Sequence, residues 1–286
     1  MGKLRALLLE PRDHLGRRQL RNPLAAAGSC VVVLFAVLAV AAPVLASHDP
    51  AAIDPAHRLQ GPSSTAWLGT DALGRDLFSR IVFGARWSLG AAILTTLLVF
   101  ALGLVVGLAA GYLGGIVDAV LLRIVDALLA FPSLLLALAI VGTLGPGVFN
   151  AVLSLAAAGW ATYARVVRGL VLTIRERPFV EAARAVGGTD LHIVLRHVLP
   201  NVLAPVAVLA TLELGEVLLA LSALSFLGFG AQPPAPEWGA MLNDARAYFF
   251  IAPRLLIAPG LAITLAAIGL NLLGDGLRDV LDPRLG

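Results

Sequence analysis

Six long apolar runs constrain this chain more than any other feature. Each holds about as many apolar residues as an α-helix needs to cross the hydrocarbon core of a bilayer, roughly 20. A helix also satisfies its own backbone polar groups, which lipid cannot do. The runs are Leu24–Leu45, Leu89–Tyr112, Val117–Val141, Val148–Val167, Val202–Phe226 and Phe249–Leu273. They predict an all-α membrane protein with six transmembrane helices.

The composition agrees with a membrane protein. Charged residues make up 14% and hydrophobic residues 59% of the chain, whereas soluble proteins carry about 25% charged residues. This excludes a soluble enzyme, a disordered chain and a collagen-like chain. The single cysteine, Cys30, lies inside the first apolar run and leaves no disulfide framework and no cysteine metal site.

Basic residues indicate the orientation of the helices. Of the 21 Lys and Arg residues, 14 lie in the three stretches 3–21, 165–196 and 278–284. Basic residues collect on the cytoplasmic side, and six crossings return the C-terminus to the side of the N-terminus. We therefore expect both termini in the cytoplasm, and basic residues that set topology rather than bind nucleic acid. A cleaved signal peptide is the alternative interpretation of the first run.

The runs divide the chain into consecutive segments, with a tight helical hairpin at Gly142–Gly147. The expected parts are a cytoplasmic segment 1–23, a first transmembrane helix 24–47, an extracytoplasmic segment 48–88, a core of five transmembrane helices 89–273 with a cytoplasmic loop 171–201, and a cytoplasmic tail 274–286.

Two stretches are expected on the extracytoplasmic side. Before the second run, a solvated or interfacial helix beginning near Asp71 is predicted, with local ion pairs among Asp71, Arg75, Asp76, Arg80 and Arg86. In the loop Gly228–Tyr248, three prolines disfavour a regular helix, and Trp238 suits the membrane–water interface. A re-entrant or lid-like loop and an inert connector both fit this loop.

Ionisable residues inside the apolar runs are costly and normally face protein or water. Arg123 and Asp126 are spaced for an i,i+3 pair on the third run. Glu213 and Glu216 share a face of the fifth run, and no cation lies nearby in the sequence. These two glutamates are candidates for lining a cavity or pairing with a partner subunit, and buried protonated carboxyls are the alternative.

No constellation of residues points to catalysis or to a cofactor. The chain has no glycine-rich loop followed by Lys and Ser or Thr, and no serine framed as a hydrolase nucleophile. His192 and His197 are five residues apart, not the four of a helical zinc pair. We expect no enzyme activity, no metal and no cofactor in this chain.

The loop between the fourth and fifth runs is the most patterned polar segment. Phe179–Val186 holds good helix formers, the pair Gly187–Gly188 breaks the helix, and Thr189 or Asp190 can cap a second one. That second helix repeats apolar residues up to Val198, and Pro200 is expected to bend the chain before the fifth run. Two short amphipathic helices hinged at paired glycines suit a groove in a cytosolic partner or the lipid headgroups.

This loop resembles that of ATP-binding-cassette (ABC) importer permeases. The matching residues are Glu181-Ala182-Ala183, then Gly187, then Leu199-Pro200; His197 stands where the general pattern has Ile. Two further stretches are similar to the C-type membrane subunit of dipeptide and oligopeptide permeases. They are the run from Leu68 to Leu89 (LGTD, GRD and GARWSL) and the ending NLLGDGLRD (Asn271–Asp279) with Asp282-Pro283-Arg284.

The resemblance implies a type I ABC importer permease fold with a cytoplasmic coupling helix, importing dipeptides or oligopeptides across the cytoplasmic membrane of a bacterium or archaeon. It implies three kinds of partner: a second homologous permease subunit forming a heterodimer, two cytosolic ATPase subunits that hydrolyse ATP, and an extracytoplasmic substrate-binding protein. Glu181 and Arg184 would orient the coupling helix, Ala182 and Ala183 would permit close approach, and Gly187 would form the turn. Nickel chelates or glutathione are alternative substrates. A secondary transporter driven by an ion gradient and a membrane scaffold are the rivals from other classes.

Overall fold

The computed structural model describes residues 23–281, and this part of the chain is built of helices and loops without a strand. Most of the predicted segment 1–23 and the end of the predicted tail 274–286 lie outside the described residues. The helices are α3 (Pro23–Leu45), α4 (Leu77–Leu113), α5 (Gly115–Leu129), α6 (Ser133–Leu144), α7 (Val148–Arg175), α8 (Pro178–Ala185), α9 (Asp190–Ile193), α10 (Leu199–Phe226), α11 (Trp238–Ala245) and α12 (Arg254–Leu281).

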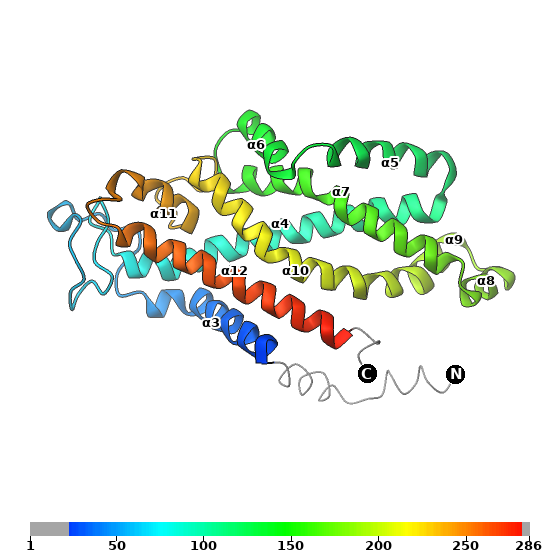
Figure 1. The fold of residues 1–286 in the computed structure, drawn as a ribbon, viewed down its shortest axis with the longest axis horizontal. Coiled ribbons are helices and arrows are strands. Elements are labelled where there is room, and N and C mark those ends of the chain that lie inside the picture. Colours follow the sequence, from blue (N-terminus) through cyan, green and yellow to red (C-terminus); the bar gives the residue numbers. More distant parts are fainter. Residues whose placement is uncertain (1–22, 282–286) are drawn as a thin grey trace.

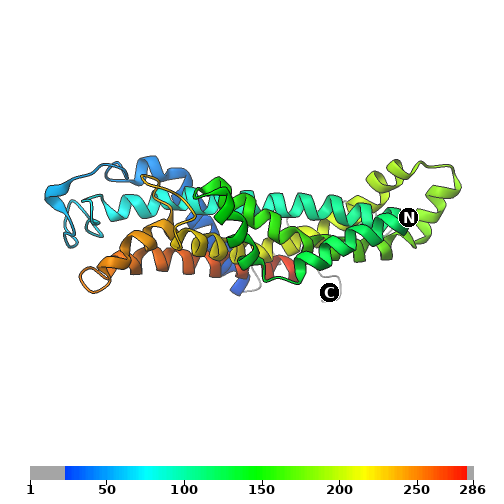
Figure 2. The same cartoon turned by 90° about the horizontal axis from the view of Figure 1, so that it is seen from above.

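The long helices α3, α4, α7, α10 and α12 run side by side along the longest axis of the molecule (Figure 1). Helices α5 and α6 lie next to α7 on one side of this bundle. Figures 1 and 2 both place α8 and α9 at one end of the bundle and α11 with the segment 46–76 at the other. The two ends are therefore separate regions joined by the long helices.

Four helical stretches are long and apolar enough to cross a membrane: α3, α4, the continuous helix Asp190–Phe226 and α12. A fifth is added if the bent pair α5 and α6 counts as one span. Helix α7 is not among them, and its second half carries Arg165, Arg168 and Arg175. The prediction of an all-α membrane protein is confirmed.

The third predicted run, Val117–Val141, is not one straight helix. It is divided into α5 and α6, whose axes meet at 90°. The break lies at Ala130–Pro132, where Pro132 disfavours a helical conformation for Phe131 and cannot donate a backbone hydrogen bond. The predicted hairpin at Gly142–Gly147 is confirmed, since α6 ends at Leu144 and α7 begins at Val148.

Helices α4 and α7 pack closely because α4 presents glycines at four-residue spacing. Gly103, Gly107 and Gly111 face α7, and a Cβ added at Gly107 would lie 2.6 Å from the Cβ of Val167. Small residues at this spacing let two helix backbones approach each other inside a membrane. This contact fixes α7 on the second half of α4.

Helix α4 begins later than the sequence suggested. It starts at Leu77, and the Asp76 side chain accepts a hydrogen bond from the Ser79 amide as its N-cap, so the helix does not begin near Asp71. Asp71 instead accepts hydrogen bonds from the amides of Leu73 and Arg75 in the preceding turn. Asp71, Arg75, Asp76 and Arg80 are buried, so this stretch is not solvated or interfacial.

The predicted second short helix of the cytoplasmic loop does not end at Pro200. Helix α9 continues through a π-helical turn, Val194–Val198, into α10. The Leu199 amide donates to the Val194 carbonyl, so the turn is one residue wider than an α-helical turn. The wider turn gives room for the ring of Pro200, which clashes with a preceding carbonyl in a regular helix.

Candidate functional site

The segment 178–193, called the elbow below, consists of α8, the turn Val186–Thr189 and α9. Pro178 occupies the first turn of α8, where its missing N–H has no intrahelical partner to lose. The Thr189 side chain accepts from the His192 amide and caps α9, which confirms one of the two predicted caps. Both helices are short, and the chain enters and leaves the elbow through the long helices α7 and α10.

The turn between α8 and α9 is closed by the backbone. The amide of Gly187 donates to the Arg184 carbonyl and the amide of Gly188 to the Ala183 carbonyl, both at 3.0 Å. This pair of bonds is a Schellman motif, and it requires a left-handed residue. Gly187 supplies it with φ +82°. The predicted break at Gly187–Gly188 is thus a tight turn with fixed hydrogen bonds.

An apolar seat fixes the elbow on the bundle. Val180 of α8 and Ile193 of α9 are fully buried against three valines, which belong to α7, to the π-helical turn and to α10: Val171, Val198 and Val202. One polar contact adds to this seat: the Tyr112 hydroxyl of α4 donates to Asp190 at 2.8 Å. Next to the elbow, Arg175 at the end of α7 donates to the Gly111 carbonyl of α4 at 3.0 Å.

The residues predicted to meet a cytosolic partner lie together on the outer surface of the elbow. Glu181, Ala182, Arg184 and Gly187 are exposed, and Ala183 is half-buried. Apolar side chains accompany them on this end of the molecule, notably Val186 (86% exposed) and Leu191 (69% exposed). Apolar side chains gathered next to charged ones are typical of a surface that binds another protein.

The charged residues of the bundle pair between helices rather than within one. Asp126 pairs with Arg165 of α7, so the expected pair Arg123–Asp126 is wrong. Asp118 likewise forms a bidentate pair with Arg168, at 2.5 and 2.6 Å. The spacing of Arg123 and Asp126 on α5 indicated a local pair, but the packing of α5 on α7 brings Asp126 to Arg165 instead.

Glu213 and Glu216 lie halfway along α10. Glu213 is half-buried and faces Tyr163 of α7, and Glu216 is exposed. Neither forms an ion pair within the part of the chain that the structure describes. Their role in lining a cavity or meeting a partner subunit stays a prediction.

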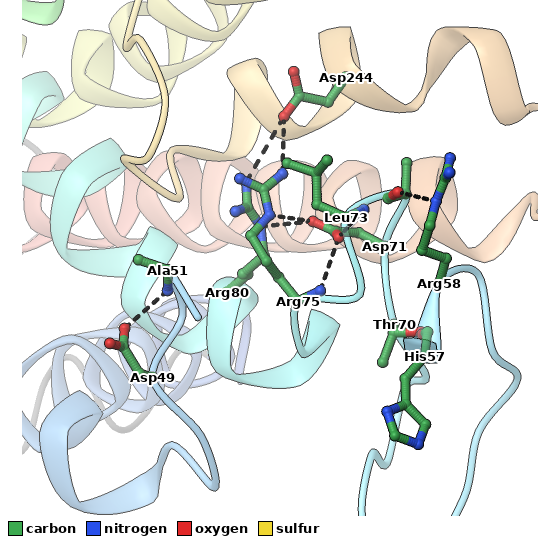
Figure 3. A network of polar contacts seen from close by, with 11 residues as sticks. Asp49, Ala51, His57, Arg58, Thr70, Asp71, Leu73, Arg75, Arg80 and Asp244 are labelled. Carbon is green, nitrogen blue, oxygen red and sulfur yellow. Dashed lines mark hydrogen bonds and ion pairs between the residues drawn. The ribbon is translucent and has the colours of Figure 1, made fainter. Parts of the chain in front are cut away.

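At the opposite end, the buried residues Asp71, Arg75 and Arg80 form a network with the exposed Asp244 (Figure 3). The Arg75 guanidinium donates to Asp71 at 2.7 Å, which confirms one of the predicted local pairs, although it lies in a turn and not on a helix. Asp244 of α11 approaches Arg75 at 3.5 Å and Arg80 at 3.9 Å. The network joins the start of α4 to α11.

Helix α11 was not expected, and it is anchored by its first residues. The Glu237 carboxylate caps it by accepting from the amides of Gly239 and Ala240, and it also accepts from the Ser88 hydroxyl at 3.2 Å. Burial raises the pKa of Glu237. Trp238 is fully buried, and its indole donates to the Ile81 carbonyl at 2.9 Å, so its ring packs within the protein and does not face lipid; its place at the membrane–water interface stays a prediction.

Sequence patterns gave no signal for these anchors. Glu237 and Ser88 are 149 residues apart, and the Arg254 side chain donates to the carbonyls of Leu59 and Gln60, at separations of 195 and 194 residues. The three prolines that precede Trp238 argued against a helix in this loop, although the eight-residue helix α11 begins just after them. Within residues 23–281, no group of three or more His, Cys, Asp or Glu side chains is placed to hold a metal ion.

A bundle of long apolar helices with a surface elbow at one end defines a polytopic membrane protein. Residues 100–286 match the family described as the binding-protein-dependent transport system inner membrane component. Residues 15–62 match the N-terminal transmembrane domain of oligopeptide transport permease C. The chain belongs to this family of inner membrane components, as the resemblance predicted.

Individual relatives agree with this assignment. The chain is 47% identical over 267 residues to the dipeptide transport system permease protein DppC of Alkalihalophilus pseudofirmus, covering 93% of this chain and 87% of that protein. It is 45% identical over 276 residues to the glutathione transport system permease protein GsiD of Pectobacterium atrosepticum, covering 96% and 92%. Both likenesses extend over nearly the whole chain, so the family assignment does not rest on a single motif.

The fold is also similar to a solved structure. An inward-facing conformation of the MetNI methionine ABC transporter superposes with a TM-score of 0.56 at 21% identity, over 71% of this chain and 97% of that chain. This likeness confirms the expected type I importer permease fold. The chain is a multi-pass membrane subunit of the ABC permease type.

Proposed function

We propose that the chain is one of two membrane subunits of an ATP-driven importer that carries peptides across the cytoplasmic membrane. Its partners are a second homologous permease, two cytosolic ATPase subunits and an extracytoplasmic substrate-binding protein. Peptide cargo is supported by the relative named for dipeptide transport. Glutathione is the alternative, supported by the relative named for glutathione transport, and it is itself a small peptide.

The observation that carries the proposal is the fixed elbow with its exposed outer face. A segment that transmits a displacement must be rigid. The hydrogen-bonded turn and the buried side chains of Val180 and Ile193 make the elbow rigid. Closure of the ATPases around ATP moves the elbow, and α7 and α10 carry the displacement into the bundle. Glu181 and Arg184 meet the rim of the ATPase, while Ala182 and Ala183 allow close approach.

This proposal sets the orientation of the molecule. The elbow and both termini lie in the cytoplasm, and α11 with the segment 46–76 lies outside, where the binding protein delivers its cargo. Glu213 and Glu216 then lie midway through the membrane. A charged or protonated carboxyl at that depth faces the other permease or the aqueous pathway, where it can meet the amino group of a peptide.

Two substitutions in the elbow test the coupling. Glu181→Lys reverses the charge of the outer face, and Gly187→Val puts a β-branched residue at a left-handed position. Both variants should insert normally but lose ATP-dependent peptide uptake, while the ATPase activity of the assembled complex persists. The measurement is uptake of a radiolabelled dipeptide into right-side-out vesicles or proteoliposomes that are loaded with ATP and contain the complete complex, with the binding protein added outside.

Glu176→Lys is a matched control, because Glu176 lies just before the elbow, at the end of α7, and not on its outer face. It should leave uptake close to the unmodified level. Normal uptake by both elbow variants would contradict the proposed coupling. Uptake that needs no ATP and stops with an ionophore would favour an ion-gradient transporter, and no flux at all would favour a scaffold.

A further inference from the structure

Arg80 is a buried cation without a close partner. The residue is 2% exposed, and its Nη1 has no hydrogen-bond partner in the described part of the chain. Its Nε lies 3.6 Å from Asp71 and its Nη2 lies 3.9 Å from Asp244. Both contacts are longer than a hydrogen bond. Since a buried guanidinium is normally paired and hydrogen-bonded, Arg80 lacks acceptors that another molecule could supply.

The two aspartates of the network are held very differently. Asp71 is buried and receives the Arg75 guanidinium at 2.7 Å together with two backbone amides. The Asp244 side chain is 48% exposed and touches both arginines only at 3.5 and 3.9 Å. Asp71 is therefore the ion-pair partner of Arg75. The Asp244 side chain can instead rotate into solvent at little cost in free energy. Without Asp244, two guanidinium groups face one carboxylate, and one positive charge is left over.

Two cavities adjoin Arg80, and both are also lined by Asp244. The smaller, of about 30 Å³, lies between the start of α4 and helix α11. The larger, of about 250 Å³, extends under the loop before α11 and is lined by further polar residues: Gln232 and Asn243. Figure 3 shows the Arg75 and Arg80 guanidinium groups side by side, with Asp244 approaching them from α11. The smaller cavity has room for about one water molecule, whereas a ligand group entering the larger one reaches Arg80 and Asp244 together.

We propose that the larger cavity beside Arg80 is a carboxylate-binding site. When no ligand is bound, the Asp244 carboxylate occupies the position that the ligand carboxylate would take. An incoming carboxylate accepts hydrogen bonds from Arg80, as guanidinium groups favour, and Asp244 turns out into water. The carboxylate comes either from the C-terminus of a peptide or from an acidic side chain of the extracytoplasmic binding protein. Only this choice of source rests on the proposed import function; the binding chemistry does not.

The test measures carboxylate binding directly, without transport. The probe is triglycine, compared with its C-terminal amide, and binding to the full chain in nanodiscs is measured by isothermal titration calorimetry. The unmodified chain should bind triglycine at least about tenfold more tightly than the amide, the usual worth of a charge-assisted hydrogen bond. Arg80→Gln should abolish this difference, and Arg86→Gln, an exposed arginine on the same helix, should retain it.

Asp244→Asn is the control for misfolding. Whereas Arg80→Gln should weaken triglycine binding, Asp244→Asn should strengthen it. Loss of the competing carboxylate should tighten triglycine binding about tenfold, which a merely destabilised protein would not do. Arg80→Lys should restore part of the preference for the carboxylate over the amide. Weaker binding in Asp244→Asn, or a preference that survives Arg80→Gln, would overturn a peptide carboxylate as the ligand.

A second arm identifies a carboxylate from the binding protein. Substrate-loaded binding protein is titrated onto the assembled complex, and its affinity is measured by surface plasmon resonance. The ligand is an acidic side chain of the binding protein if three results are found together. The chain binds triglycine and its amide equally, Arg80→Gln weakens the affinity for the binding protein about tenfold, and Asp244→Asn strengthens that affinity. If neither probe responds to both substitutions, the proposed site is wrong, while dipeptide uptake with an intact elbow would still support the import function.

Discussion

The elbow end and the α11 end of the bundle are fixed by different kinds of contact. The elbow is held by backbone hydrogen bonds within the turn Val186–Thr189 and by valines that lie near one another in the sequence. Helix α11 is held by side chains: Trp238 bonds to Ile81, Glu237 to Ser88, and Asp244 approaches Arg75, each across more than 140 residues. Apart from the Tyr112–Asp190 bond across 78 residues, the elbow end is built from contacts close in the sequence, whereas the α11 end is built from long-range contacts.

The difference has a consequence for function. Because backbone bonds hold the turn of the elbow, the polar side chains on its outer face need not stabilise the fold and can face a partner. The α11 end uses its polar side chains to hold itself together, and only the loosely held Asp244 and Arg80 are left to respond to a ligand. The elbow transmits movement and needs free side chains on its surface, whereas the α11 end binds a ligand with side chains that also hold the fold. The two functions are therefore placed at separate ends of the bundle.

Trp238→Ala should give the largest effect, because it removes the anchor of α11. The side chain is fully buried and packs edge-to-face on Phe35 at 5.5 Å between ring centroids. We expect a loss of about 3–5 kcal/mol in the free energy of unfolding, measured by thermal unfolding of the purified chain in detergent. Trp87→Ala, at an exposed position on α4, should change it by less than about 0.5 kcal/mol. Equal losses would mean that α11 is not anchored by Trp238.

Val180→Ala tests whether apolar contacts hold the elbow. The substitution removes two buried methyl groups and should cost about 2 kcal/mol. Hydrogen exchange of the α8 and α9 amides should speed up, while the α11 amides should stay protected, since the two ends share no contact. Val186→Ala is the control on the same helix end, because Val186 is exposed. Faster exchange at both ends would show that the bundle responds as one unit.

The local end could be predicted from the sequence and the long-range end could not. The break at Gly187–Gly188 and the cap at Thr189 follow from conformational preferences of single residues, and both were predicted. The apolar runs also located the long helices. The bend at Pro132 was missed because the run Val117–Val141 stays apolar across it, and hydropathy does not report a change of direction.

The residues of the α11 end escaped prediction for a physical reason. Glu237 and Trp238 follow three prolines, which argued against a helix, and the hydroxyl and carbonyl that fix them belong to α4. Arg75 and Arg80 were expected in solvent because charged residues at local pairing distance usually lie there. Only the tertiary packing of α11 over the start of α4 buries them.

Glu237 provides a prediction for pH. Burial raises the pKa of this carboxyl above its ordinary value of 4.5, so the folded state disfavours the charged form more than the unfolded state does. The stability that this group contributes is complete below pH 4.5 and is lost as the pH rises through the raised pKa. The melting temperature should fall more steeply above pH 4.5 in the unmodified chain than in Glu237→Gln. Parallel profiles would contradict a raised pKa.

Thr189→Ala should give the smallest effect, and it examines the local end at its weakest bond. The Thr189 hydroxyl accepts from the His192 amide at 3.4 Å, near the limit of a hydrogen bond. Loss of an N-cap costs about 0.5–2 kcal/mol, and the long bond and exposed position place this one at the low end. Hydrogen exchange of the His192 amide should speed up, whereas Thr189→Ser should preserve its protection. If the alanine variant instead unfolded the whole elbow, the side chain of Thr189 would contribute more to the turn than its two backbone bonds do, and the elbow would no longer be held by its backbone.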